Sequence, residues 1–145
     1  MSRGERLSPV HELAEQAEQG RAAQLGDCER RHAEAERRLV ELKGYEGEYQ
    51  RSFEARARGG TNMRGLREHQ MFIARLAEAV RAQQAVVEQT GRECHAARAQ
   101  WREAAVRAQA IGKVIEKART EERMDSERRA QREQDEMALR DRVRK

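Results

Sequence analysis

Cysteine and histidine are the residues of this chain whose spacing comes closest to a catalytic or metal site. Cys28 and His32 are four positions apart and Cys94 and His95 are adjacent, so a helical hairpin could gather all four into a zinc site. Neither spacing matches the usual zinc-ligand motifs, and His95 would point about 100° of helix rotation away from Cys94. We therefore expect no metal, and we expect both thiols to pack as small apolar side chains.

No other arrangement in the sequence predicts catalysis. The chain has no acid pair, no nucleophile beside a base, and no glycine-rich phosphate loop that stands out from its many charges. After Gly59 and Gly60 the sequence lacks the Lys-Ser or Lys-Thr that a phosphate-binding loop requires. The single tryptophan, Trp101, falls where packing is the expected role. We predict no enzymatic activity and no cofactor.

The elements that would position such residues follow from the composition. Of 145 residues, 39% are charged and only 3% are aromatic, and the mean hydropathy is -1.08. So few large apolar side chains cannot fill a globular core. Ala, Glu, Gln, Arg and Leu dominate and there is one proline, which favours long exposed helices over disorder.

The distribution of charge argues against nucleic acid as a partner. There are 30 basic and 26 acidic residues, a net charge of +4, and both signs mix within single helical turns, as in Glu36 and Arg37. A phosphate-binding surface needs its cations gathered on one face. No run approaches the ~20 apolar residues of a membrane span, and residues 1–10 lack a signal-peptide core. We therefore expect a cytoplasmic protein with reduced cysteines.

Alternating steps of three and four residues mark an apolar ladder from Leu66 to Ala118. Thirteen of its sixteen positions are apolar, which is typical of a coiled-coil seam. A weaker ladder precedes it, through Leu25, Cys28, Ala35, Leu39, Leu42, Tyr49 and Phe53. The seam residues singled out across both ladders are Leu25, Cys28, Leu39, Ile73, Val80, Val87, Cys94, Trp101, Ile111 and Ile115.

The two ladders predict an all-α fold, a long two-stranded antiparallel coiled-coil hairpin over residues 1–118. Facing residues would have numbers that add up to about 122, which sets Cys28 against Cys94. The first helix is expected over about 8–57, with Ser8 as N-cap and Pro9 as its first residue. Gly-Gly-Thr-Asn lies in the turn, 58–62, and the second helix covers about 63–118. Residues 119–145 form a charged tail, helical or frayed, and fraying is expected in isolation.

A strip of apolar and aromatic residues is expected to cross both helices near the turn. The hairpin would place Tyr49 beside Phe72, Tyr45 beside Leu76, and Leu42 beside Ala79. Exposed aromatic residues on a highly charged surface are a natural binding hot spot. Lateral packing between the two helices is the alternative explanation.

In the order and spacing of these six residues, and in its length and helical pattern, the chain resembles the FliJ family of flagellar type III export proteins. The family pattern is a Leu and two Tyr, then a Phe, a Leu and an Ala after the turn. Here these are Leu42, Tyr45, Tyr49, Phe72, Leu76 and Ala79. Two polar positions beside the strip hold Arg38 and Gln83, where the family pattern has Gln and His.

The resemblance implies a coiled-coil stalk similar to the γ stalk of rotary ATP synthases. Its terminal half would enter the pore of the hexameric export ATPase FliI, and the strip would bind the linker of the export-gate protein FlhA. Contacts with substrate chaperones are implied as well. So is a peripheral position at the cytoplasmic face of the inner membrane, in the flagellar basal body. The protein would thereby support flagellum biogenesis, motility and chemotaxis.

Two other functions fit the same residues. One is the YscO-like stalk of a virulence type III secretion injectisome, which shares the mechanics and serves a different machine. The other is a structural coiled-coil scaffold without an ATPase partner, for which strong self-association is expected.

Overall fold

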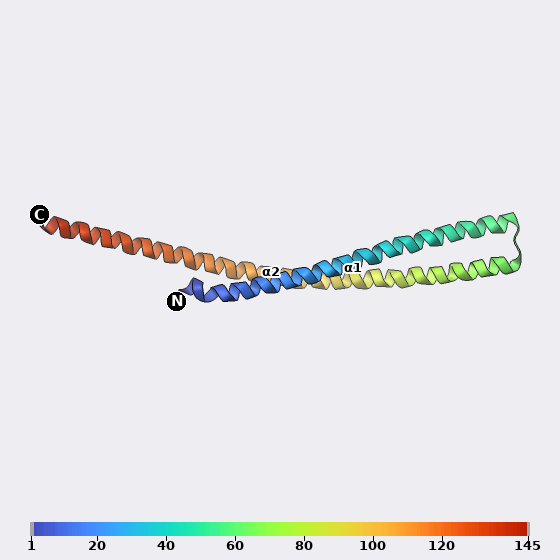
Figure 1. The fold of residues 1–145 in the computed structure, drawn as a ribbon, viewed down its shortest axis with the longest axis horizontal. Coiled ribbons are helices and arrows are strands. Elements are labelled where there is room, and N and C mark those ends of the chain that lie inside the picture. Colours follow the sequence, from blue (N-terminus) through green and yellow to red (C-terminus); the bar gives the residue numbers. More distant parts are fainter. Residues whose placement is uncertain (1, 145) are drawn as a thin grey trace. The chain divides into compact units, whose positions relative to one another are not determined.

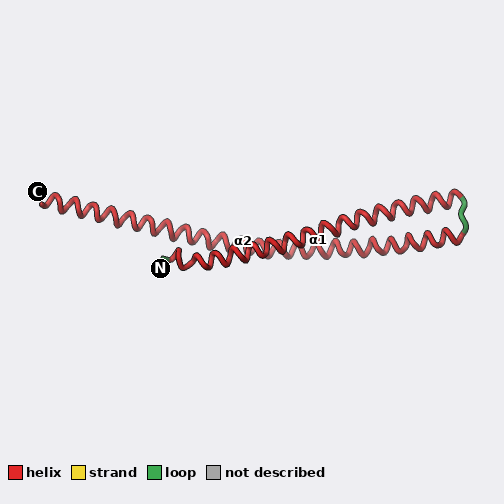
Figure 2. Tube along the Cα trace, in the orientation of Figure 1, coloured by secondary structure: helices red, strands yellow, loops and turns green. Residues whose placement is uncertain are grey.

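A computed structural model describes residues 2–144, which are helical almost throughout (Figure 2). Helix α1 covers Arg3–Gly59 and helix α2 covers Met63–Arg144, and no strand occurs among the described residues. The two helices pack against each other in opposite directions, and they are joined by the non-helical residues 60–62 (Figure 1). The all-α antiparallel hairpin predicted from the two ladders is confirmed.

The chain divides into two units, each made of one segment of either helix. Residues 21–100 form the turn unit, and residues 1–20 together with 101–145 form the terminal unit.

The link between the helices uses two residues for distinct conformational tasks. Gly60 has a φ of +78°, in the left-handed region that glycine adopts without steric cost, so it ends α1 directly after Gly59. Asn62 then caps α2, because its Oδ1 accepts a hydrogen bond from the Gly65 backbone N–H at 2.8 Å. Its carbonyl also accepts the first intrahelical bond, from Leu66 N at 3.2 Å. The conformation of the turn is thus specified by the backbone of Gly60 and by the side chain of Asn62.

The start of α1 differs from the sequence-based expectation. The helix begins at Arg3 and not after Ser8, and Pro9 lies inside it. The reason is a capping box: Ser2 Oγ accepts from the Glu5 N–H at 3.1 Å, and Glu5 Oε2 accepts from the Ser2 N–H at 3.4 Å. These reciprocal bonds hold the first turn despite Pro9, which has no N–H to donate to the Glu5 carbonyl.

The buried positions of the helix-helix seam are mostly small residues, and the larger seam residues are only half-buried. The buried apolar side chains are Ala14, Cys28, Ala35, Val80, Cys94, Ala97, Ala108, Ile115 and Ala118. No side chain among the described residues is completely enclosed. Every position of the ladder from Leu66 to Ala118 is nevertheless buried or half-buried. Alanine and cysteine let two helices approach closely, but they bury little apolar area per residue. The seam is therefore thin.

The terminal unit ends its seam where α1 begins. Gly4 is buried, and a Cβ added there would lie 3.5 Å from Arg119 Cγ. The first turn of α1 lies beside the start of this segment of α2, and all of residues 119–144 are exposed. This segment is helical to Arg144, where fraying was expected. Strong helix formers and i,i+3 pairs such as Arg128 with Asp125 favour the helical state.

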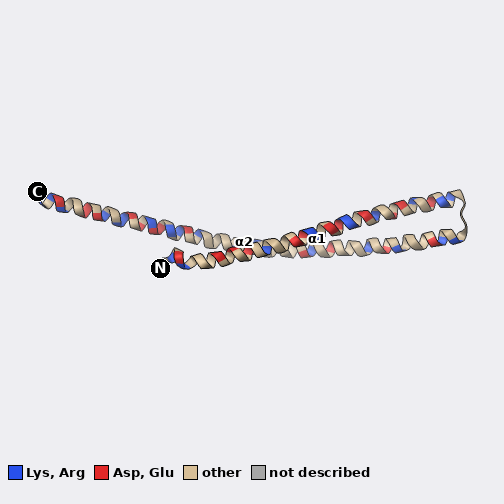
Figure 3. Cartoon of the chain, in the orientation of Figure 1, with Lys and Arg blue, Asp and Glu red and all other residues tan. Residues whose placement is uncertain are grey.

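Charges of both signs alternate along both helices (Figure 3). Most ion pairs join residues three or four positions apart on one helix, and exposed pairs of this kind contribute little stability each. Among residues 2–144, no helix has the length and apolar character needed to cross a membrane.

Candidate functional site

The aromatic strip lies in the turn unit, on both helices. Tyr49 of α1 and Phe72 of α2 are in contact, with ring centroids 4.5 Å apart and ring planes tilted by 47°. Tyr45 is 51% exposed, Phe72 44% and Tyr49 38%, so all three rings are open to solvent. The other strip residues, Leu42, Leu76 and Ala79, are half-buried. The strip therefore has an apolar base in the seam and an aromatic rim, an arrangement that suits a peptide or helix from a partner.

His69 is a buried residue that contacts Tyr49 of the strip. It was not singled out from the sequence as a site residue. It is the one buried polar residue among the described ones, and its Nε2–H donates to the Tyr49 carbonyl oxygen at 2.8 Å. Its ring stacks on Phe53, with centroids 5.6 Å apart. The heptad position of His69 is visible in the sequence. Its bond to a carbonyl of the other helix requires the three-dimensional register.

A second side chain crosses from α2 to the backbone of α1. Gln83 Nε2 donates to the Ala35 carbonyl at 3.0 Å and is half-buried. Close by, His32 Nδ1 lies 2.9 Å from Thr90 Oγ1, and His32 Nε2 lies 2.8 Å from Glu36 Oε1. The polar ladder residues His32, Gln83 and Thr90 are thus hydrogen-bonded across or along the seam. They fix the pairing of the helices, because a shifted register would leave them buried without partners.

The two cysteines lie opposite each other, as the register predicts. Cys28 and Cys94 form a buried cluster with Ala97, and Leu25 packs against that cluster. Two ion pairs between the helices flank it, Arg98 with Glu29 at 2.8 Å and Arg31 with Glu93 at 3.7 Å. Within the described part of the chain, no group of three or more His, Cys, Asp or Glu residues could hold a metal ion.

The structure gives the remaining seam residues two levels of burial. Val80 and Ile115 are buried together with the two cysteines, while the others are half-buried. The half-buried residues are Leu25, Leu39, Ile73, Val87, Trp101 and Ile111.

In the terminal unit, Trp101 does more than pack. Its Nε1–H donates to Glu18 Oε1 at 2.8 Å, which joins α2 to α1 through a partly buried bond. Trp101 was expected to act through packing alone. A buried indole needs an acceptor, and Glu18 supplies it from the opposite helix.

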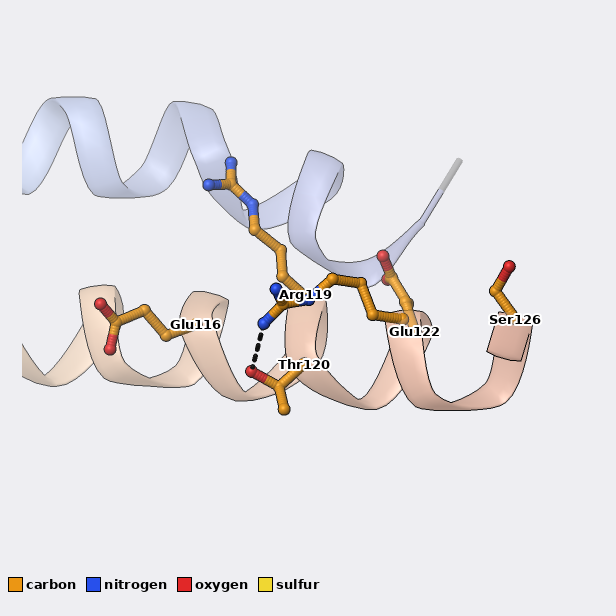
Figure 4. Close-up of a pocket in the computed structure, with 6 residues that line it drawn as sticks. Glu116, Arg119, Thr120, Glu122 and Ser126 are labelled. Carbon is orange, nitrogen blue, oxygen red and sulfur yellow. Dashed lines mark hydrogen bonds between the residues drawn. The ribbon is translucent and has the colours of Figure 1, made fainter. Parts of the chain in front are cut away.

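A shallow groove follows α2 past the start of α1 (Figure 4). It is lined by Glu116, Arg119, Thr120, Glu122, Arg123 and Ser126. Thr120 Oγ1 accepts a hydrogen bond from Arg123 at 3.5 Å, so one wall is organised within the helix itself. The groove is open and mixed in charge, which suits contact with another protein better than enclosure of a small molecule.

Comparison with known proteins decides the family. Residues 2–145 match the family described as flagellar FliJ protein. The chain belongs to the FliJ family. It is therefore a component of the flagellar type III export apparatus, and the family is not a known enzyme family. The match favours the flagellar machine over the injectisome counterpart. No curated protein and no solved structure matches the sequence.

Proposed function

We propose that this protein is a stalk of the flagellar export apparatus, with one binding surface in each unit. The strip of the turn unit would bind the linker of the export-gate protein FlhA. The terminal unit would enter the pore of the hexameric ATPase FliI. The protein would work at the cytoplasmic face of the inner membrane, attached through these partners, with substrate chaperones as further partners. The observation that carries the proposal is the exposed Tyr49–Phe72 contact in a FliJ-family chain.

The strip has the features of a binding hot spot. Its rings are large and held by the helices, so little conformational entropy is lost when a partner covers them. Tyr45 has Gly44 and Gly47 as near neighbours on α1, and a Cβ at Gly44 would meet nothing within 4 Å. An extended chain could therefore approach the Tyr45 ring from the Gly44 side, whereas the Arg51 guanidinium covers Gly47.

The terminal unit has features suited to a ring-shaped partner. Residues 119–144 expose every side chain, and they carry acidic and basic groups in alternation. A helix without a partner helix, and with both charge signs on its surface, can form polar contacts on all sides at once. Such contacts are individually weak, and they allow one surface to meet several subunits in turn.

The test of the strip compares three single substitutions. Tyr45→Ala and Phe72→Ala should weaken binding of the gate linker by about thirtyfold, the effect of losing a hot spot of ~2 kcal/mol. Val40→Ala is the matched control, because Val40 is 71% exposed on the same helix but lies outside the strip. Tyr45→Ala and Val40→Ala should melt within about 0.5 kcal/mol of the parent chain by circular dichroism. Phe72→Ala should cost about 1 kcal/mol, because it also loses the ring contact with Tyr49. If Val40→Ala weakens binding as much as Tyr45→Ala does, the strip is not the gate site.

The test of the terminal unit removes residues 119–145. This truncation should lower stimulation of ATP hydrolysis by the export ATPase while gate binding is retained. Loss of gate binding with hydrolysis still stimulated would mean that the two surfaces are assigned the wrong way round. A chain that binds neither partner but associates strongly with itself would instead support the scaffold function.

A further inference from the structure

The contact between Cys28 and Cys94 has no part in the proposed function, yet it joins two reactive groups. Both thiols are free, each residue is 9% exposed, and the two lie in one cluster on opposite helices. A disulfide requires facing side chains with Cβ atoms about 4 Å apart. Facing small residues in a closely packed two-helix seam approach one another in this way. The pair is therefore positioned to bond within one chain.

The surroundings give the two thiols different reactivity. Arg31 Nη2 donates a hydrogen bond to Cys28 Sγ at 3.3 Å, so a guanidinium group lies beside this sulfur. Burial raises the pKa of the Cys94 thiol, and the neighbouring Cys28 raises it further. Cys28 thus has a cationic hydrogen-bond donor at its sulfur, whereas Cys94 is held as a neutral thiol.

Small molecules can approach the pair along two shallow grooves. Cys28 lines one of them, together with Gln24, Asp27 and Arg31. Cys94 lines the other, together with Glu29, His32 and His95. Both grooves combine charged side chains with alanines, and each of them leads from solvent to one of the two sulfurs.

We propose that Cys28 and Cys94 are a redox-active pair, which a peroxide converts into a disulfide between α1 and α2. The Cys28 thiolate attacks one peroxide oxygen, and the second oxygen leaves and is protonated to water. The resulting Cys28 sulfenic acid is then attacked by the Cys94 sulfur, which forms the S–S bond and releases a second water. Two thiols and one hydrogen peroxide thus become one disulfide and two waters. A reducing dithiol returns the disulfide to two thiols by exchange and is itself oxidised to a disulfide.

The bond would act at the buried cluster of the turn unit, where the two helices meet through small side chains. The cluster contains alanine and leucine but no large enclosed side chain, and two exposed ion pairs flank it. In the reduced protein, no covalent bond holds the two helices together at this point. Within the turn unit, a disulfide would prevent α1 and α2 from separating and from sliding along each other. It would also close a long loop that includes the turn. The switch is independent of which partner binds the strip.

The experiment treats the full-length reduced protein with hydrogen peroxide, alkylates the remaining thiols, and examines the product by non-reducing electrophoresis and intact mass. The expected product is a faster-migrating monomer that has lost two hydrogen atoms and two alkylation sites. Its midpoint of thermal unfolding should rise by about 10 °C. Disulfide-linked dimers as the main product would overturn the proposal. So would two surviving thiols at a peroxide dose that oxidises the urea-unfolded chain.

Matched variants test the geometry and the assigned roles. Cys94→Ala combined with Val87→Cys moves one thiol seven residues, ~10 Å, along the same face of α2. Val87 lies outside the cysteine cluster, so this variant should not form the intramolecular bond. Cys94→Ser should accumulate a sulfenic acid that dimedone traps at Cys28, whereas Cys28→Ser should yield several-fold less adduct at Cys94. Arg31→Gln should slow oxidation of the intact pair several-fold. Equal rates in the displaced-thiol variant and the parent chain would show that the facing contact is not what directs the bond.

Discussion

His69 of α2 donates a hydrogen bond from Nε2 to the carbonyl oxygen of Tyr49 on α1, at 2.8 Å. This carbonyl lies beneath one of the exposed rings of the strip, so a buried side chain of one helix holds the backbone that carries a proposed contact residue of the other. Stacking on Phe53 fixes the imidazole ring in place. The His69 side chain therefore contributes both to the stability of the hairpin and to the position of Tyr49 in the strip.

Substitutions at His69 should separate the hydrogen bond from the ring packing. His69→Phe keeps a ring against Phe53 but removes the donor, and it should lower the free energy of unfolding by about 1 kcal/mol. His69→Gln keeps an N–H donor and should restore part of that loss. Urea unfolding followed by circular dichroism measures both variants. If His69→Phe is as stable as the parent chain, the bond to Tyr49 contributes nothing to the fold.

Two glycine-to-alanine substitutions should change stability in opposite directions. Gly44→Ala should raise the free energy of unfolding by about 1 kcal/mol, because the site is helical and has open space for a methyl group. Gly60→Ala should lower it by about 1–2 kcal/mol, since alanine disfavours the φ of +78° found there. The same chemical change at two positions is its own control. Equal effects would mean that the link between the helices is not formed as described.

The first turns of α1 give a third pair of predictions. Pro9→Ala should stabilise the protein by about 1–3 kcal/mol, because it restores an N–H that can donate to the Glu5 carbonyl. Ser2→Ala removes the N-cap oxygen and should cost about 1 kcal/mol. Thermal melts of the two variants give both numbers. A destabilised Pro9→Ala variant would indicate that α1 starts at Pro9, with Ser8 as its N-cap, as the sequence suggested.

The buried thiol of Cys94 predicts how stability depends on pH. Its pKa in the folded protein is raised, chiefly by burial, so the folded state holds this proton more tightly than the unfolded chain does. The stabilisation is fully present below the unfolded pKa, and it is lost as the pH rises through the folded pKa. Between pH 7 and about 10, Cys94→Ala should therefore lose less stability than the parent chain. Parallel slopes for the two proteins would contradict the raised pKa.

Periodicity was sufficient to predict the architecture, because a two-stranded coiled coil is decided by one repeating relation between apolar positions. Leu66 to Ala118 could be read as a seam without knowledge of any partner, and Cys28 could be set against Cys94 from the numbering alone. The aromatic strip was also placed in advance. The structure brings Tyr49 and Phe72 together, and the binding role of the strip stays a prediction.

The features that the sequence predicted wrongly, or did not predict, are those that depend on individual hydrogen bonds. Ser8 with Pro9 is a common helix start, but the bonds between Ser2 and Glu5 begin the helix earlier and override it. The bonds from His69 to Tyr49 and from Trp101 to Glu18 were not foreseen, because they join groups distant in sequence. A heptad pattern reports which face of a helix is buried. It does not report which polar atoms find each other across the seam.

The bond between Trp101 and Glu18 has a consequence for optical spectroscopy. Trp101 is the only tryptophan in the chain, and it belongs to the terminal unit. Indole fluorescence therefore reports on the terminal unit, and the turn unit contributes no tryptophan emission. Its emission wavelength depends on how much water reaches a ring that is half-buried and hydrogen-bonded to a carboxylate. A ligand that covers the terminal unit should shift the emission to the blue, while one that covers only the aromatic strip should leave it unchanged. The native chain thus contains an unlabelled fluorophore that distinguishes its two proposed surfaces.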